Sequence, residues 1–240
     1  INELNRAISY TSENNPTLQM NLYNKYFSRS SSQLFLNSKE REYIQEHPVL
    51  KVLVHDGFGP IQYYDGKGQV QGVARDLLSS IAQKAGWTLD FVYADDYSEF
   101  EQALNEGRAD VILSILYDYD TVQKKNVLLS NPYLETESVL VARDGFDMTN
   151  LKGGVQAVYM GMRKSDDDRT DVRFYDSLEE SLNAVEKGEC DYTYSNSYTA
   201  SYYLSRNRYE HVSIYPQAGS DSVKYSIGIL RKDDKQILAI

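Results

Sequence analysis

The sequence predicts an α/β protein built from two similar lobes with a cleft between them. Segments with the patterns of strands and helices alternate over residues 49–116, and a second alternating series covers residues 154–230. A β-α-β order implies a mostly parallel sheet with helices on both faces. Ligands of such sheets bind at the carboxyl ends of the strands, so we expect a binding site where the two halves face each other.

The first series contains three short apolar strands and two helices. Leu77, Ile81 and Ala85 give the first helix one apolar face, and a glycine follows each helix, as is common at helix ends. Asp65-Gly66-Lys67-Gly68 predicts a turn. The predicted elements are strands at 50–54, 89–93 and 111–116 and helices at 73–85 and 97–106.

The second series repeats the theme, with strands at 154–158, 172–175, 191–194, 212–215 and 223–230 and helices at 177–186 and 197–205. We expect two crossing strands, near residues 140–142 and 224–226, to join the lobes and act as the hinge. The predicted organisation is a helical N-terminal segment at 1–37, lobe 1 at 38–142 plus 224–240, and lobe 2 at 143–223.

The N-terminal segment has helical spacing before the lobes begin. Apolar residues repeat every three or four positions in 1–8 and again in 18–26, and a serine-rich linker follows at 28–32. A short charged helix is predicted at 38–46, with Ser38 as its N-cap, and His47-Pro48 closes it.

Composition excludes several classes of function. The formal net charge of −10 argues against nucleic acid and against an anionic membrane surface, since both need a basic face. Cys190 is the single cysteine, and the three histidines are too scattered to form a metal set. The run at 166–168 is acidic but lacks the glycine and distal glutamate of a calcium loop. We expect no metal and no cofactor.

Six motifs in order over residues 50–240 resemble the family-3 bacterial extracellular solute-binding proteins. They are the strand at 50–54 with Phe58-Gly59-Pro60, Gly72-Val73-Ala74-Arg75-Asp76-Leu77, the step at 104–110, Ser130-Asn131-Pro132-Tyr133, Leu151-Lys152-Gly153 with Val155, and Gly188-Glu189-Cys190-Asp191. The resemblance implies a periplasmic-binding-protein-like (type II) fold that captures a small molecule between its lobes, outside the cytoplasm.

The charged helix that ends in His47-Pro48 is similar to the lead-in of Venus-flytrap input modules of membrane-bound histidine kinases and diguanylate cyclases. Such modules often stand in tandem, and the chain looks like a processed piece of a membrane-anchored parent. Residues 1–29 are then either the closing helices of a preceding sister module or a segment that docks where this module's final helix would sit. In both cases we expect them to pack on lobe 1.

The resemblance also assigns residues to the cleft. In amino-acid-binding members an arginine grips the ligand carboxylate and an aspartate accepts hydrogen bonds from the ammonium group. Those positions fall on Gln123 and Asn196, and the carboxylate loop of lobe 2 falls near Gly161-Met162. Since each charge-assisted hydrogen bond contributes about 1.5–3 kcal/mol, the two amides should cost a free amino acid roughly 3–6 kcal/mol.

Aromatic side chains complete the expected binding site. Phe58 and Tyr97 fall at the family's two stacking positions, although both residue types are also common in cores at strand and helix ends. Among the many tyrosines of 192–209, which we attribute to strand propensity and helix packing, only Tyr194 is expected near the cleft. The remaining expected ligand-binding residues are Asp56, Tyr117, Asp118 and Met162.

The sequence therefore predicts an extracytoplasmic small-molecule sensor module of a transmembrane signalling protein, with a ligand other than an ordinary α-amino acid. The alternative is the binding component of a transporter for amino-acid-like solutes, because one fold serves both roles. An enzyme is not expected, because catalysis needs a positioned acid or base and nothing pairs Asp56 or Asp118 convincingly. His55 lies beside the cleft strand, and we expect a structural role for it.

Overall fold

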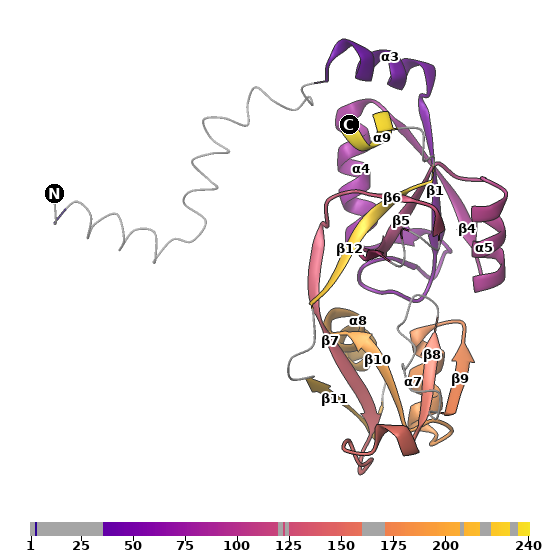
Figure 1. Ribbon diagram of the computed structural model, residues 1–240, viewed down its shortest axis with the longest axis vertical. Helices are drawn as coiled ribbons and strands as arrows, with labels where there is room; N and C mark the ends of the chain where they lie inside the picture. The colour runs from indigo at the N-terminus through magenta and orange to yellow at the C-terminus, as the bar shows by residue number, and fades with distance from the viewer. Residues whose placement is uncertain are drawn as a thin grey trace.

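The computed structural model has two lobes stacked along its long axis (Figure 1). It describes residues 3, 36–119, 122, 125–159, 171–206, 209–216, 222–230 and 235–240. One continuous sheet runs through both lobes in the order β4-β1-β5-β12-β7-β10-β8-β9. This arrangement confirms the predicted fold class, because each lobe has its own α/β layers and two strands connect them.

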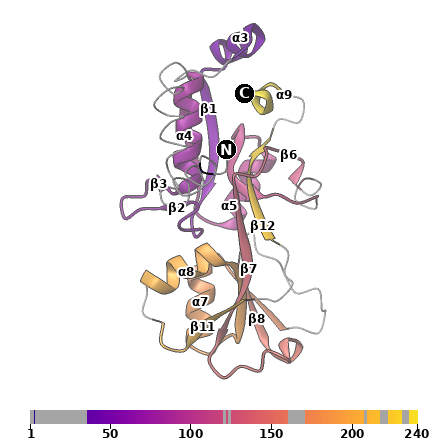
Figure 2. The same cartoon turned by 90° about the vertical axis from the view of Figure 1, so that its left-hand side faces the viewer.

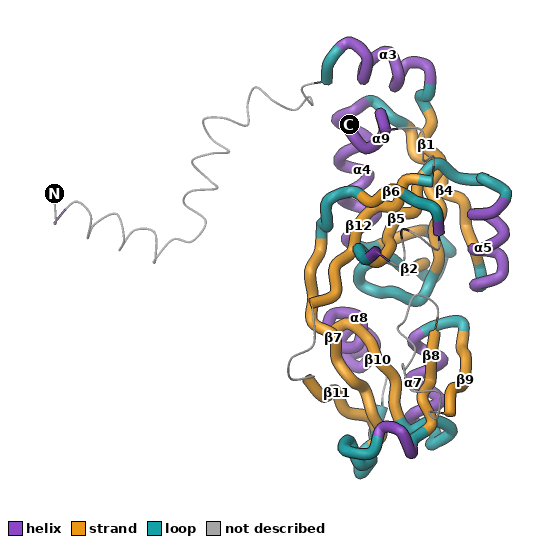
Figure 3. The backbone as a smooth tube through the Cα atoms, in the orientation of Figure 1, coloured by secondary structure: helices purple, strands orange, loops and turns teal. Residues whose placement is uncertain are grey.

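Lobe 1 is built on three parallel strands, β1 (Val49–His55), β4 (Thr88–Ala94) and β5 (Val111–Leu116). Alternate residues of β1 point to opposite faces, as a strand requires. Val52 packs in the core beneath α4 (Val73–Ala85), whereas Leu53 packs beneath α5 (Tyr97–Asn105). Helices therefore cover both faces of this part of the sheet (Figure 3).

Helix α3 (Ser38–Glu46) lies at the outer end of lobe 1 beside the short C-terminal helix α9 (Lys235–Ala239). Its N-cap is Asn37, so the expectation that Ser38 caps the helix is wrong. The Asn37 side chain accepts from the backbone N–H of Glu40 at 3.0 Å, and the Glu40 carboxylate accepts from the Asn37 N–H at 2.7 Å. This capping box satisfies two backbone donors that Ser38 would leave open.

Two long strands cross between the lobes (Figure 2). Strand β7 (Leu134–Arg143) pairs over its first residues with β12 (Ser222–Ile229), and its later residues pair with β10 (Tyr192–Asn196) and β11 (Val212–Pro216) of lobe 2. Strand β12 also pairs with β5 and with the short β6 (Leu128–Leu129). The crossing of β7 thus lies nearer to Thr136 than to residues 140–142, whose buried side chains belong to the lobe 2 cores.

Lobe 2 places helices against a sheet formed by β8 (Val155–Tyr159), β9 (Asp171–Tyr175), β10 and the end of β7. Helix α7 (Leu178–Glu186) buries Leu178, Leu182 and Val185, and α8 (Ser197–Arg206) buries Ala200 and Tyr203 in the same core.

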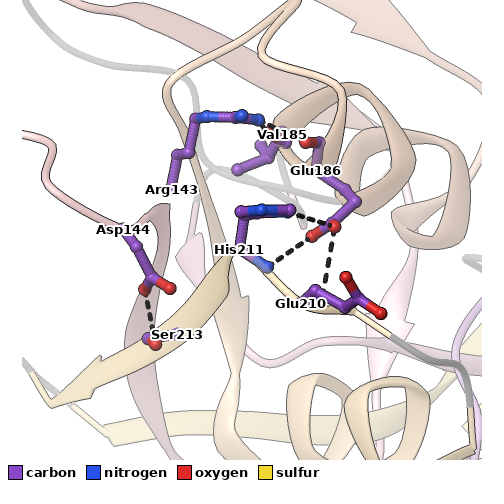
Figure 4. A network of polar contacts seen from close by, with 7 residues as sticks. All are labelled: Arg143, Asp144, Val185, Glu186, Glu210, His211 and Ser213. Atoms are coloured by element: carbon purple, nitrogen blue, oxygen red, sulfur yellow. Dashed lines mark hydrogen bonds and ion pairs between the residues drawn. The ribbon is translucent and has the colours of Figure 1, made fainter.

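Polar contacts fasten the outer end of lobe 2 (Figure 4). The Arg143 guanidinium donates to the backbone oxygens of Val185 and Glu186 at the end of α7. The Glu186 carboxylate accepts from the backbone N–H groups of Glu210 and His211 at 3.1 and 3.0 Å, and from the His211 Nδ1 at 2.9 Å. These bonds tie the residues just before β11 to α7.

Smaller elements complete the described part. The hairpin β2 (Tyr63–Tyr64) and β3 (Val70–Gln71) closes around the predicted turn, and Figure 2 shows it above α8. A 3-10 turn, η2, spans Leu151–Gly153. No helix in the described ranges is long and apolar enough to cross a membrane. The predicted helices of 1–29, the docking expected of them and the acidic run at 166–168 lie outside the described residues.

Candidate functional site between the lobes

The loop that follows β1 reaches from lobe 1 into the core of lobe 2. A small bridge shapes it, in which the backbone N–H groups of Phe58 and Gln62 each donate to the other residue's carbonyl oxygen, at 3.1 and 3.0 Å. The Phe58 side chain is only 6% exposed and packs with the lobe 2 residues of β8, α7 and α8. Its ring centroid lies 5.6 Å from that of Tyr159 on β8.

Glycines let the same loop approach lobe 2 closely. A Cβ added to Gly59 would lie 2.3 Å from a ring carbon of Tyr202 on α8, which is well inside van der Waals contact. A Cβ on Gly57 would lie 3.1 Å from the Cβ of Ser177, the N-cap of α7. The Tyr63 ring of lobe 1 also lies 5.5 Å from the Tyr202 ring. The two lobes are therefore in direct contact along this loop.

A second set of contacts lies beside the crossing strands. The Asn196 amide group donates to the Tyr225 hydroxyl of β12 at 2.9 Å and to the Thr199 hydroxyl at 2.8 Å. Its oxygen accepts from the Thr199 backbone N–H at 2.9 Å, so Asn196 caps the first turn of α8. Thr136 and Ser197 share a hydrogen bond of 2.8 Å nearby. Asn196 thus joins the crossing strand β12 to lobe 2.

His55 supports the loop from inside lobe 1. Its ring lies between Phe58 and Phe100, with centroids 4.7 and 5.1 Å away, and the Gln62 amide nitrogen bonds the ring. Burial, and to a smaller extent the positive charge of Lys125, lower the pKa of His55 to about 3. A neutral ring keeps an acceptor nitrogen for Gln62, which agrees with the expected structural role of His55.

The phenols around the contact are held neutral. Burial raises the pKa of Tyr159 to about 12, against the opposing effect of its hydrogen bond to Ser195. Burial also raises the pKa of Tyr203, although the Gly59 backbone bonds the phenol oxygen, and the charge of Asp56 acts in the same direction as burial. Neutral phenols can donate and accept hydrogen bonds, and their faces can hold apolar or cationic groups.

The structure brings only some of the predicted site residues together. Phe58 lies at the lobe contact, and exposed Asp56 lies next to it, where its carboxylate accepts from the backbone N–H groups of Gly57 and Tyr64. Asn196 lies at the crossing strands. These residues come from both lobes, as expected of an interlobe site.

Of the other predicted site residues, Tyr117 lies beside the crossing strand β12, and the rest lie elsewhere or are not described. Tyr117 and Asp118 are exposed beyond the end of β5, where the Tyr117 N–H donates to the backbone oxygen of Lys224. Tyr194 packs with Tyr192 and Leu140 in a different lobe 2 cluster from the one that contains Phe58. Tyr97 begins α5, and its side chain is not described. Gln123 and Met162 fall outside the described residues.

Several contact residues were missed by reasoning from the sequence. Tyr202 and Tyr203 belong to the tyrosine-rich run that we attributed to strand propensity and helix packing, and both touch the lobe 1 loop. Tyr159 and Tyr63 gave no separate signal. The only signal available was the density of tyrosine itself. Within the described ranges, no three His, Cys, Asp or Glu side chains are grouped to hold a metal ion.

The family model for bacterial extracellular solute-binding proteins, family 3, matches residues 50–240. The chain belongs to this family. The contacts described above lie between the two lobes of this member. The match confirms the resemblance drawn from the six motifs.

Two sensor proteins are similar in sequence to this family member. The sensor protein EvgS of Escherichia coli K12 is 29% identical over 124 residues, which are 51% of this chain and 10% of EvgS. The virulence sensor protein BvgS of Bordetella pertussis is 22% identical over 179 residues, which are 71% of this chain and 14% of BvgS. The chain therefore spans only a small part of the length of either relative.

Solved structures of the family have the same fold. The BvgS periplasmic domain superposes with a TM-score of 0.70 at 21% identity, covering 85% of this chain and 41% of that one. Holo ArgBP from T. maritima superposes with a TM-score of 0.70 at 25% identity, covering 82% of this chain and 89% of that one. The fold is thus shared with the periplasmic domain of BvgS and with ArgBP.

Proposed function

We propose that the chain is an extracytoplasmic ligand-sensing module of a transmembrane signalling protein. The observation that carries this proposal is the packing of the lobe 1 loop, with Phe58 at its centre, in the core of lobe 2. This interface lies between two lobes that strands β7 and β12 connect. It defines a closed state, whose population a ligand can change by binding it more or less tightly than an open state. The similarity to EvgS and BvgS supports the same role.

The ligand in this proposal is a small molecule other than an ordinary free α-amino acid. Gln123 and Asn196 stand where amino-acid-binding relatives are expected to have an arginine and an aspartate. The three polar contacts of Asn196 to Thr199 and Tyr225 already occupy its amide group. Neutral phenols of Tyr159, Tyr202 and Tyr203 surround the contact, which favours a ligand with aromatic, hydroxyl or cationic groups over one with a bare carboxylate.

Steric separation of the lobes tests the sensing role. Gly59→Ala adds a methyl group that would collide with Tyr202, so it disfavours the closed state, and Gly59→Ala combined with Tyr202→Ala removes the collision. Gly66→Ala is the matched control, because a Cβ there meets no atom within 4 Å. Each variant is fused in place of the periplasmic domain of a sensor kinase, and the autophosphorylation of this chimera is measured in cells.

We expect Gly59→Ala to change kinase output and the double variant to return it towards the wild-type level, while Gly66→Ala has no effect. If folded Gly59→Ala protein gives wild-type output, lobe closure does not control a signalling output and the proposal fails.

The alternative function is the binding component of a transporter for amino-acid-like solutes. The similarity to holo ArgBP over 89% of that protein favours it. A transport role predicts solute uptake that depends on this chain and a partner permease, and it predicts no dependence of kinase output on Gly59. The chimera and an uptake assay therefore separate the two roles.

A further inference from the structure

Three aspartates of the chain precede a glycine, at Asp56-Gly57, Asp65-Gly66 and Asp144-Gly145. Because glycine has no Cβ, its backbone nitrogen is unhindered. This nitrogen can attack the carboxyl carbon of the preceding aspartate and close a five-membered succinimide ring. Whether the two atoms meet depends on the fold, and the folded protein holds the three carboxyl groups in different ways.

The Asp56 carboxylate lies against the nitrogen that would attack it. Its Oδ1 atom accepts from the Gly57 backbone N–H at 2.7 Å, so the carboxyl carbon, one bond further, lies beside that nitrogen. The same oxygen accepts from the Tyr64 backbone N–H at 2.9 Å. Negative charge develops on this oxygen while the ring closes, and a fixed N–H donor stabilises it as in an oxyanion hole. Asp56 is exposed, so water can reach the ring that forms.

The other two aspartates are held by donors farther along the chain. Asp65 Oδ1 accepts from the backbone N–H groups of Lys67 and Gln69 at 2.8 and 3.0 Å. The bonds from Gln69 and Lys67 lower the pKa of Asp65, so the protonated carboxyl, which is the form that loses water, is rarer there. The Asp144 carboxylate accepts from the Ser213 hydroxyl at 2.8 Å. Both side chains must break a hydrogen bond before they can turn to the glycine nitrogen.

We propose that Asp56-Gly57 is a site of spontaneous isomerisation, and that isoaspartate at residue 56 separates the lobes. The Gly57 nitrogen forms a bond to the Asp56 carboxyl carbon, and the bond from that carbon to Oδ2 breaks. Oδ2 leaves as water, with the proton of the N–H group and that of the carboxyl group. A second water then cleaves the bond between the Asp56 main-chain carbonyl carbon and the Gly57 nitrogen. The main chain now runs through the former side-chain carboxyl, and the former main-chain carbonyl is a free carboxylate.

Isoaspartate adds one carbon atom to the main chain at the start of the loop that contacts lobe 2. This loop has little free space, because a Cβ on Gly57 would lie 3.1 Å from the Ser177 Cβ and a Cβ on Gly59 would lie 2.3 Å from a ring carbon of Tyr202. The longer loop therefore no longer fits the core of lobe 2 with Phe58 in place. The reaction itself does not depend on the sensing role, whereas any effect on signalling rests on the function proposed above.

Peptide mapping of the aged protein tests the site. The full chain is kept at neutral pH and physiological temperature, and isoaspartate is located by digestion and mass spectrometry with electron-transfer dissociation, which distinguishes it from aspartate. We expect it to form at residue 56 about fivefold faster than at residues 65 and 144, the factor that corresponds to one typical hydrogen bond. In concentrated urea, where these hydrogen bonds are broken, the three rates should become similar. Equal rates in the folded protein, or the same preference for residue 56 in urea, would overturn the proposal.

Two glutamate variants connect the reaction to the lobe contact. Asp56→Glu keeps a carboxylate but would have to close a less favourable six-membered ring, so it should not isomerise at residue 56, whereas Asp65→Glu should do so at the wild-type rate. On ageing, the radius of gyration from small-angle X-ray scattering should increase for the wild type and Asp65→Glu but not for Asp56→Glu. An unchanged radius in wild-type protein that carries isoaspartate at residue 56 would overturn the effect on the lobes. A negative result with the kinase chimera would leave both measurements unaffected, so the two proposals fail separately.

Discussion

Acid should destabilise this protein through His55. The side chain is 7% exposed, lies between two phenylalanine rings, and has its pKa lowered from 6.5 to about 3 by burial and by Lys125. The unfolded chain therefore binds a proton between pH 6.5 and pH 3 that the folded protein does not. The stability that neutral His55 provides is complete above pH 6.5 and decreases as pH falls through this range.

The expected size follows from the two pKa values. A pH of 5 lies about 1.5 pH units below the unfolded-state pKa of 6.5 and above the folded-state pKa. At 1.36 kcal/mol per unit, the free energy of unfolding at pH 5 is about 2 kcal/mol lower than at pH 7. Urea unfolding at pH 7 and pH 5 measures this difference in the free energy of unfolding.

Two variants make the assignment specific. His55→Gln keeps a polar side chain without a titrating ring, so most of the difference between pH 7 and pH 5 should disappear, whatever its absolute stability. His47→Gln, at a half-buried histidine of the same lobe, should retain the difference. A wild type equally stable at both pH values, or a His55→Gln variant with the full wild-type difference, would refute this reasoning.

Two further substitutions and one ligand titration have expected outcomes. Asn196→Ala removes the cap of α8 and leaves the buried Tyr225 hydroxyl without its amide partner, so urea unfolding should show a loss of about 2–4 kcal/mol; a loss below about 0.5 kcal/mol would contradict the cap. Glu186→Gln should cost about 1 kcal/mol at pH 7. Burial alone would raise the pKa of Glu186, but hydrogen bonds from His211 and Glu210 outweigh it and lower this pKa. The stability that the Glu186 carboxylate contributes is therefore present at neutral pH and is lost as pH falls below about 4.5. An equal cost of Glu186→Gln at pH 7 and at pH 3 would contradict this. Calorimetric titration with the twenty common amino acids should give no dissociation constant below about 100 μM, and micromolar binding of any of them would contradict the ligand class proposed for the cleft.

Much of the fold could be predicted because local patterns specify it. Helix α4 has the predicted bounds, since its apolar residues keep helical spacing and Gly86 follows with a φ of 92°, a conformation that glycine adopts readily. Strand β5 also has its predicted bounds, because it is a continuous apolar run buried on both faces. Strand β7 was harder to predict, because its first half crosses between the lobes and carries polar residues such as Glu135 and Glu137.

The contacts of the candidate site could not be read from local patterns. Phe58 and Tyr159 are neighbours in space but lie 101 positions apart in the chain, and a single sequence gives no signal for such a pair. The loop glycines suggested a turn, whereas the structure shows that Gly59 also leaves room for a tyrosine of the other lobe. Asn196 was assigned from a family position, and its hydrogen bonds to β12 and α8 required the folded structure.

The distance between the lobes in solution is the most direct test of the account. Spin labels on Asp76→Cys of α4 and Glu179→Cys of α7, with buried Cys190 left in place, report that distance by double electron–electron resonance. For the ligand-free protein we predict one narrow distribution, and for Gly59→Ala an added population at longer distance that Tyr202→Ala removes. A broad distribution in the wild type, or one that Gly59→Ala leaves unchanged, would contradict a pair of hinged lobes held together by the loop around Phe58.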